Sequence, residues 1–340
     1  MTSPTPVHYL STLSFPDWWL DELRARHPRL TVTQVPAVSP ADVPDEVWRR
    51  TQILHTGAVF PATPGTTPDL RWIQLDTSGA DHLKDTGVWD LPVPLTSIGG
   101  ISPVPMAEYV MMMLLGLAHR LPRAVEVQHS GTWPSPGERW NTLMPRRLRG
   151  ATVGVVGYGR IGREIGRLAG QFGMTVLGLK RGRATRTGDF FGTPAADPAD
   201  ATELYTPDEL HAFLGRCDYL VVTCPLTDET RGMIDAAALD ALKDGAMVVN
   251  VSRGGIVDED ALRAGLRSGR IAGAALDVFD EEPLPADHHW WNEPGVILTP
   301  HVAGFAPDYE EQTLELVSAN VERFLADREL INLVDRSRGY

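Results

Sequence analysis

Short apolar runs and longer amphipathic stretches alternate along this chain. Apolar runs rich in β-branched residues and bounded by turn residues are typical of buried strands, whereas an apolar position every three or four residues is typical of a helix. In the first hundred residues this pattern predicts a helix at 16–25 and strands at 7–10, 30–35, 51–59, 70–75 and 93–96. Such an alternation predicts a parallel sheet covered by helices.

The alternation resumes after residue 150. The predicted strands there are residues 152–156, 174–179, 218–223, 246–251, 271–275 and 296–298. The predicted helices are residues 163–172, 235–242, 259–268 and 307–325. Six strands with intervening helices indicate a doubly wound sheet. We therefore expect an α/β protein with two Rossmann-like doubly wound parallel-sheet domains and a cleft between them.

The segment that joins the two halves has a different pattern. Residues 105–127 predict one helix that is apolar on nearly every face and has a proline in its first turn. A helix of this kind is buried on all sides, either between domains or against another subunit. Residues 131–149 are rich in Pro, Trp and Arg without clear periodicity, which predicts a loop.

Composition narrows the class of protein. The chain has 340 residues, 43% of them hydrophobic and 22% charged, which is typical of about two soluble globular domains. The formal net charge of −13 disfavours nucleic acid as a partner, because phosphate binding depends on clustered Lys and Arg. We expect neither a membrane anchor nor a signal peptide, and two cysteines make no disulfide framework. We therefore expect a cytoplasmic enzyme.

The hexapeptide G-Y-G-R-I-G at residues 157–162 lies between a predicted strand and a predicted helix. In that context a G-x-G-x-x-G pattern indicates a dinucleotide-binding turn. Gly157 permits the tight turn, Gly159 lets the backbone approach a pyrophosphate, and Gly162 lets the helix pack close to the strand. The N-terminus of the helix then offers free N–H groups to the anion.

The residues after the next predicted strand distinguish between the two nicotinamide coenzymes. An acidic residue about eighteen positions beyond Gly162 would bind the ribose hydroxyls of NAD, but Lys180, Arg181 and Arg183 occupy this region. Cations there would attract the 2′-phosphate of NADP, so the sequence favours NADP. The alternative, that these are solvated loop charges and either coenzyme binds, stays open.

Polar side chains follow three later strands. Arg253 comes after the strand at 246–251, Asp277 and Glu282 follow the strand at 271–275, and His301 follows the strand at 296–298. Ligands of open parallel sheets lie outside the carboxyl ends of the strands, so we expect these side chains at the coenzyme edge. No spacing of His, Cys, Asp or Glu indicates a metal site.

These segments, together with the glycine turn and C-P-L-T-D-E-T at 224–230, resemble the D-isomer-specific 2-hydroxyacid dehydrogenase family, and in particular its glyoxylate and hydroxypyruvate reductases. The resemblance covers residues 100–304 and is looser before them. It implies a discontinuous substrate domain at 1–100 plus 305–340. It also implies a dinucleotide-binding domain at 101–304, whose dimerisation arm at about 105–149 would make the protein a homodimer.

The resemblance also implies catalytic roles. His301 would be the acid in reduction of a 2-oxo acid, and Glu282 would hydrogen-bond its imidazole and favour the protonated form. Arg253 would bind the carboxylate and the carbonyl oxygen of the substrate. The other side of the substrate would be bound by backbone amides of the loop Ser78, Gly79 and Ala80. Asp277 would lie near the nicotinamide carboxamide.

The implied contacts with the coenzyme are more numerous. They are Gly157, Gly159, Arg160, Ile161, Gly162, Lys180, Arg181, Arg183, Cys224, Pro225, Thr230, Val251, Ser252, Asp277, Ala303 and Gly304.

The expected activity is NAD(P)-dependent reduction of a small 2-oxo acid to a D-2-hydroxy acid. A coenzyme-sensing binding protein similar to corepressors of this fold is the alternative. Formate oxidation is disfavoured, because that chemistry uses a glutamine where Glu282 stands. Phosphite oxidation stays possible, but no residue pattern in the sequence specifically indicates it.

Overall fold

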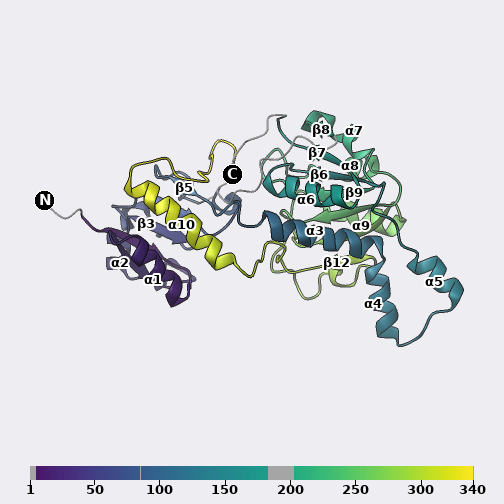
Figure 1. The fold of residues 1–340 in the computed structure, drawn as a ribbon, viewed down its shortest axis with the longest axis horizontal. Helices are drawn as coiled ribbons and strands as arrows, with labels where there is room; N and C mark the ends of the chain where they lie inside the picture. Colours follow the sequence, from purple (N-terminus) through teal and green to yellow (C-terminus); the bar gives the residue numbers. More distant parts are fainter. Residues whose placement is uncertain (1–4, 85, 183–202, 340) are drawn as a thin grey trace. The chain divides into compact units, whose positions relative to one another are not determined.

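The computed structural model describes residues 5–84, 86–182 and 203–339. The chain divides into two compact units, one formed by Met1–Ile101 with Ala306–Tyr340 and the other by Ser102–Phe305. Each unit is built on one parallel β-sheet with helices on both faces (Figure 1). The expected α/β class with two parallel sheets is therefore confirmed.

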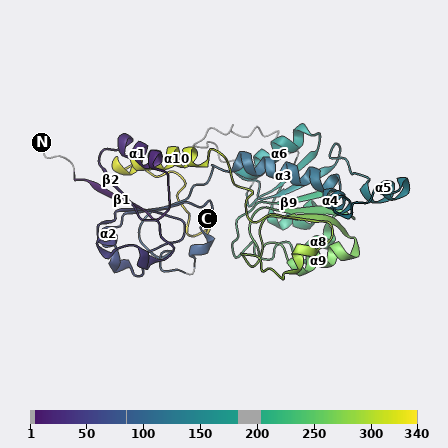
Figure 2. The ribbon, with the colours of Figure 1, turned by 90° about the horizontal axis from the view of Figure 1, so that it is seen from below.

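The smaller unit has a five-stranded sheet in the order β2-β1-β3-β4-β5. Its strands are β1 (Val7–Ser11), β2 (Leu30–Gln34), β3 (Ile53–Thr56), β4 (Trp72–Leu75) and β5 (Leu95–Thr96). This is the order of flavodoxin-like folds, whose ligands bind beyond the carboxyl ends of the strands. Helices α1 (Asp17–Arg26) and α10 (Tyr309–Leu325) cover one face and α2 (Asp45–Arg50) covers the other (Figure 2).

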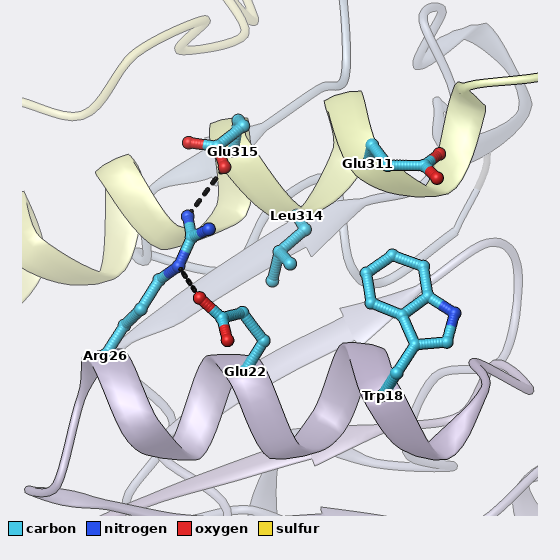
Figure 3. Close-up of a pocket in the computed structure, with 6 residues that line it drawn as sticks. All are labelled: Trp18, Glu22, Arg26, Glu311, Leu314 and Glu315. Carbon is cyan, nitrogen blue, oxygen red and sulfur yellow. Dashed lines mark hydrogen bonds and ion pairs between the residues drawn. The ribbon is translucent and has the colours of Figure 1, made fainter.

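Helices α1 and α10 come from opposite ends of the chain and pack side by side. Arg26 of α1 donates to Glu22 at 2.8 Å and to Glu315 of α10 at 2.7 Å (Figure 3). These charges rim a hollow of about 310 Å³ that is also lined by Trp18, Glu311 and Leu314. Carboxylates predominate there and no predicted site residue lines it, so the hollow does not suit an anionic substrate.

The larger unit has a seven-stranded sheet in the order β12-β11-β10-β9-β6-β7-β8. Its strands are β6 (Thr152–Val156), β7 (Thr175–Leu179), β8 (Glu203–Tyr205), β9 (Tyr219–Val222), β10 (Ala246–Asn250), β11 (Ile271–Leu276) and β12 (Val296–Leu298). The order reverses between β6 and β9, and at such a point the crossovers diverge and leave a crevice for a ligand.

Helices cover both faces of this sheet. Helices α3 (Pro103–Ala118) and α6 (Arg160–Gln171) lie on one face, and α8 (Ala236–Ala241) and α9 (Glu259–Ser268) lie on the other (Figure 2). The sequence did not predict β8 or α7 (Leu210–Leu214), because Glu203–Tyr205 is not an apolar run and the five residues of α7 are too few to show a helical repeat. No helix in the described parts of the chain is long and apolar enough to cross a bilayer.

Single-turn 3-10 helices occupy several of the connections. They are Pro40–Asp42, Pro64–Thr66, Asp81–Leu83, Pro207–Glu209 and His289–Asn292. The last of these lies in the connection that leads to β12, and Asp81–Leu83 follows the loop after β4. Each such turn satisfies a few backbone groups where the chain changes direction.

The expectation of one helix over residues 105–127 was wrong. Helix α3 ends at Ala118, and α4 (Leu121–Ser130) begins after Arg120 adopts the left-handed conformation with φ 56°. Pro122 is the cause, because a proline inside a continuous helix lacks an N–H group and clashes with the preceding turn. At the start of α4 the same proline is tolerated.

The expectation of a loop over residues 131–149 was also wrong in part, since the segment contains α5 (Pro136–Leu143). The N–H group of Ser135 donates to Glu138 Oε2 at 2.8 Å, and the N–H of Glu138 donates to Ser135 Oγ at 3.3 Å. This reciprocal pair is a capping box, and S-P-G-E is its sequence signature. That signal was overlooked because the following turns show no apolar stripe.

Candidate active site at the carboxyl edge of the larger sheet

The glycine turn after β6 has the geometry that its sequence predicts. Gly157 adopts φ +92°, and a Cβ there would lie 2.5 Å from the backbone nitrogen of Cys224. A Cβ at Gly162 would lie 2.5 Å from the carbonyl oxygen of Gly157, so α6 packs directly against the turn. Gly159 faces open space, and no side chain caps the first turn of α6. The backbone therefore leaves room and N–H donors for a pyrophosphate, which fits a dinucleotide.

The segment after β9 is held in place by hydroxyl groups. Thr230 Oγ1 donates to the carbonyl oxygen of Pro225 at 2.7 Å and accepts from the N–H of Thr227 at 2.8 Å. Ser252 Oγ donates to the carbonyl oxygen of Cys224. Burial raises the pKa of the Cys224 thiol to about 12, so this thiol stays neutral. The segments after β9 and β10 thus form one wall, in which Cys224 is a packing residue rather than a nucleophile.

Cations gather where β7 ends. Lys180 follows the last residue of β7, and its pKa is lowered by burial and by the nearby charge of Arg163 on the first turn of α6. Arg181 forms an ion pair with Glu229 at 3.0 Å on the surface. The like charges of Lys180 and Arg163 repel each other, and an anion placed between them would relieve this repulsion. The predicted Arg183 lies outside the described residues.

Asn250, which the sequence analysis missed, shapes the loop that carries Arg253. Its Nδ2 donates to the carbonyl oxygen of Arg253 at 3.1 Å, and its Oδ1 accepts from the N–H of Ser252 at 3.1 Å. The guanidinium of Arg253 donates to the carbonyl oxygen of Ser252 at 2.8 Å. A buried asparagine at the end of an otherwise apolar strand was the available signal, because a buried amide needs polar partners.

The loop with Arg253 packs against the loop after β11. A Cβ at Gly254 would overlap the carbonyl group of Phe279, so only glycine permits this approach. The N–H of Gly255 also donates to Asp280 Oδ1 at 2.5 Å. These contacts bring the Arg253 loop and the Glu282 loop to the same edge of the sheet.

His301 and Glu282 form a close pair. Nδ1 of His301 lies 2.7 Å from Oε2 of Glu282, while Oε1 of Glu282 accepts from the N–H of Phe279 at 2.9 Å. The pair is partly open to solvent, with His301 47% and Glu282 35% exposed. His301 adopts φ 55°, a conformation that is unfavourable for a residue other than glycine. The contact assigns Nδ1 to Glu282, so Nε2 is the nitrogen that can meet a substrate.

Buried Asp277 anchors the turn that carries His301. Its Oδ1 accepts from Thr299 Oγ1 at 2.5 Å and from the N–H of Val302 at 2.9 Å, and its Oδ2 accepts from the N–H of Ala303 at 2.9 Å. The N–H of His301 itself donates to the carbonyl oxygen of Asp277 at 2.9 Å. These bonds stabilise the left-handed conformation of His301. The coenzyme contact expected for Asp277 remains a prediction.

Tyr109 of α3 extends this anchor. Its hydroxyl group hydrogen-bonds Thr299 Oγ1, and burial raises its pKa to about 12. Val251 and Ala303 are buried beside this region, and a Cβ at Gly304 would touch Ser102 Oγ. Three loops of the larger unit therefore place a guanidinium, a carboxylate and an imidazole at one sheet edge.

The predicted carboxylate loop, Ser78 to Ala80, belongs to the smaller unit and follows β4. Thr77 Oγ1 donates to the carbonyl oxygen of Gly79 at 2.7 Å and closes the turn. Among the hydrogen bonds of the described residues, none uses the N–H groups of Ser78, Gly79 or Ala80 as donors. These N–H groups are therefore available to an anion.

The chain is similar to known proteins in sequence and in overall structure. Residues 111–303 match the family model described as D-isomer specific 2-hydroxyacid dehydrogenase, NAD binding domain. The (S)-sulfolactate dehydrogenase of Chromohalobacter salexigens is 35% identical over 77% of this chain and 79% of its own length. The glyoxylate reductase of Thermococcus onnurineus is 33% identical over 78% of this chain and 79% of its own length.

A solved structure is similar over nearly the whole chain. It is a D-isomer specific 2-hydroxyacid dehydrogenase from Xanthobacter autotrophicus Py2 in complex with NADPH and MES. The similarity has a TM-score of 0.78 with 30% sequence identity and covers 99% of this chain and 100% of that one. The similarity thus extends to both units of the chain.

Proposed function

Because this chain belongs to the D-isomer specific 2-hydroxyacid dehydrogenase family, we propose that it reduces a small 2-oxo acid to a D-2-hydroxy acid with NADPH. The observation that carries this proposal is the 2.7 Å contact between His301 Nδ1 and Glu282 Oε2. A carboxylate beside an imidazole fixes its tautomer and stabilises its protonated form. Such a pair suits the transfer of a proton to a carbonyl oxygen.

Each side chain has a distinct task in this proposal. The nicotinamide coenzyme supplies the hydride when it is bound. His301 donates the proton from Nε2 to the carbonyl oxygen, which becomes the hydroxyl group, and Glu282 stabilises the imidazolium before the transfer. Arg253 binds the carboxylate and polarises the carbonyl group through its planar guanidinium. The N–H groups of residues 78–80 bind a carboxylate oxygen.

We assign the coenzyme to the edge of the larger sheet. The turn at residues 157–162 and the first turn of α6 would bind the pyrophosphate. Lys180 and Arg181 would bind the 2′-phosphate, which is why we favour NADP over NAD. The remaining contacts would come from Cys224, Pro225, Thr230, Val251, Ser252, Asp277, Ala303 and Gly304.

A substrate panel tests the activity. The loss of NADPH absorbance is followed with glyoxylate, hydroxypyruvate, pyruvate and 3-sulfopyruvate, since the relatives include a glyoxylate reductase and a sulfolactate dehydrogenase. We expect turnover with at least one acid and, where the product is chiral, a product of D configuration. Tight NADPH binding with no turnover on any acid would contradict the proposal and indicate a coenzyme-sensing protein instead.

Coenzyme preference provides the first mutational prediction. The double variant Lys180→Asp, Arg181→Ala is expected to raise the ratio of kcat/KM with NADH to kcat/KM with NADPH by about 10²-fold, because an acidic residue binds ribose hydroxyls and repels the 2′-phosphate. Lys243→Gln is the matched control, because Lys243 is paired with Asp218 at 2.9 Å and lies outside the proposed site. Equal kcat/KM for NADH and NADPH in the unmutated protein would contradict the preference.

We also propose that the protein is a homodimer assembled through α4 and α5. Large apolar side chains are exposed on these helices and the residues next to them, namely Leu121, Val125, Trp133, Trp140 and Met144. Exposed apolar side chains gathered in one segment favour a protein interface. Figure 1 shows α4 and α5 projecting from the body of the larger unit.

Light scattering tests the dimer. At micromolar concentration the measured mass is expected to be about twice the 37.2 kDa of the chain. Leu121→Glu combined with Val125→Glu is expected to give a monomer, because it places charges in the apolar interface. Val38→Asp is the control, since Val38 is 95% exposed in the smaller unit and should leave the mass unchanged. A monomeric unmutated protein would refute this assembly.

A further inference from the structure

The smaller unit contains a buried cluster of titratable side chains that the proposed reaction does not use. Tyr9 on β1 lies with its hydroxyl group 2.6 Å from Nδ1 of His55 on β3. On the other side of the ring, Nε2 of His55 lies 3.4 Å from Oδ1 of Asp76. Tyr309 on α10 donates to Oδ2 of Asp76 at 3.4 Å and to its main-chain oxygen at 3.2 Å.

The Tyr9 and His55 end of the cluster is shielded from water, while the side chain of Asp76 is 17% exposed. His55 is 0% exposed, and its ring is stacked against Phe15 at 5.2 Å and lies near Trp19 at 6.1 Å. His55 Nε2 and Asp76 Oδ1 face each other at 3.4 Å, and neither atom has a hydrogen-bond partner among the described residues. Burying such groups costs free energy that an apolar core would avoid. Packing alone therefore does not account for these residue types.

His55 and Tyr309 both face Asp76. A carboxylate only accepts hydrogen bonds, so the tautomer of His55 that suits this arrangement carries its proton on Nε2, which faces Asp76. Burial and the charge of Asp76 raise the pKa of Tyr9 well above its ordinary value, so its hydroxyl group remains a donor to Nδ1 of His55. Burial and Asp76 raise the pKa of Tyr309 as well, so its hydroxyl group also remains a donor.

Asp76 lies at the base of the loop with the available N–H groups. It directly follows β4, its N–H donates to the carbonyl oxygen of Thr56 at 3.0 Å, and Thr77 and the loop come next. An uncompensated carboxylate this close to an anion-binding loop would repel an anionic substrate. The donors from His55 and Tyr309 offset this charge and at the same time fix the start of the loop.

We propose that His55, Asp76 and Tyr309 position the loop Ser78 to Ala80 for binding the carboxylate of the substrate. This inference rests on the proposed function, because it takes the loop to be the carboxylate-binding segment. The three side chains act through the loop and are positioning residues. Their loss is expected to raise KM for the 2-oxo acid while kcat and the KM for NADPH stay close to those of the unmutated enzyme.

The key variant is His55→Phe, which keeps an aromatic ring and removes both nitrogen atoms. With the best 2-oxo acid of the panel, we expect KM to rise about tenfold, because the Asp76 carboxylate loses the imidazole that faces it, with kcat within about twofold. The matched control is His27→Phe. His27 is buried in the same unit, and its Nε2 hydrogen-bonds Ser318 of α10 at 2.7 Å. His27→Phe therefore shows the effect of losing a buried histidine contact outside the cluster.

The double variant His55→Phe, Asp76→Asn separates charge from packing. Without the carboxylate of Asp76 there is no charge for His55 to offset. KM for the 2-oxo acid is therefore expected to return to within about threefold of the unmutated value. Tyr309→Phe is a second variant that tests the proposal if His55→Phe fails to fold. We expect it to raise KM for the 2-oxo acid about threefold with kcat unchanged. An unchanged KM in a folded His55→Phe or Tyr309→Phe variant, or a lowered kcat alone, would overturn the proposal.

Calorimetric titration with oxamate separates this inference from the proposed activity, because it needs no turnover. Oxamate is a non-reacting analogue of a 2-oxo acid and is titrated into the protein with NADPH present. His55→Phe is expected to weaken oxamate binding about tenfold, and His27→Phe is expected to leave it unchanged. If the unmutated protein reduced no acid, the proposed function would fail. Equal oxamate binding by His55→Phe and the unmutated protein would instead refute the positioning cluster.

Discussion

Replacing His301 with glutamine is expected to lower kcat for the 2-oxo acid by about 10³-fold, within the range that a positioned proton donor contributes. Glutamine keeps a polar side chain of similar length but cannot donate a proton at the required rate. The KM for NADPH should change little, because the glycine turn and the Lys180 region are untouched. Steady-state kinetics with saturating NADPH measure the effect.

His288→Gln is the matched control, because His288 lies in the connection before β12 and is outside the proposed proton path. It should keep kcat within about twofold. Glu282→Gln is expected to lower kcat by about 10- to 100-fold, because the imidazolium loses its charged partner but the acid itself remains. A kcat for His301→Gln within tenfold of the unmutated value would show that the proton comes from another group.

The second large effect is expected at Arg253. Arg253→Gln should lower kcat/KM for the 2-oxo acid by about 10²- to 10³-fold, because two charge-assisted hydrogen bonds to the carboxylate and the carbonyl oxygen are lost. Arg253→Lys keeps the charge but not the planar fork, and should recover only part of the loss. Coenzyme binding, measured by fluorescence titration with NADPH, should stay within about threefold.

Arg267→Gln is the control for Arg253. Arg267 lies on α9, is 61% exposed and pairs with Glu293 at 3.2 Å, so its loss removes a cation of the larger unit outside the proposed site. We expect no change in kcat/KM for this variant beyond about twofold. An Arg253→Gln variant that matched Arg267→Gln would exclude Arg253 from substrate binding.

Features set by a short stretch of sequence could be predicted. The turn at residues 157–162 is one, because Gly157 has a positive φ and a Cβ at Gly162 would meet the carbonyl oxygen of Gly157 within the same turn. Each strand can also be located from its own stretch of sequence, together with the residues that follow it. Arg253, Glu282 and His301 could therefore be placed after strand ends. Their expected roles came from resemblance rather than from the pattern alone.

Features that depend on contacts between distant segments could not be predicted. Asp280 accepts from the N–H of Gly255 in the loop after β10, and no spacing in the sequence indicates such a contact. His55 lies on β3 and Asp76 directly follows β4, and no spacing in the sequence indicates that these two side chains meet. The break at Arg120 was missed for a different reason, since the apolar pattern continues through it and only Pro122 signals it.

The smaller unit is assembled from both ends of the chain, and this has a consequence for its biosynthesis. Helix α10 packs against α1, and Trp19 Nε1 donates to the carbonyl oxygen of Glu310, 291 residues away. The larger unit is continuous from Ser102 to Phe305, so all of its strands are available once that stretch has left the ribosome. The five-stranded sheet emerges first but must wait for α10 to cover one of its faces. The first unit to be synthesised is therefore the last to complete its core.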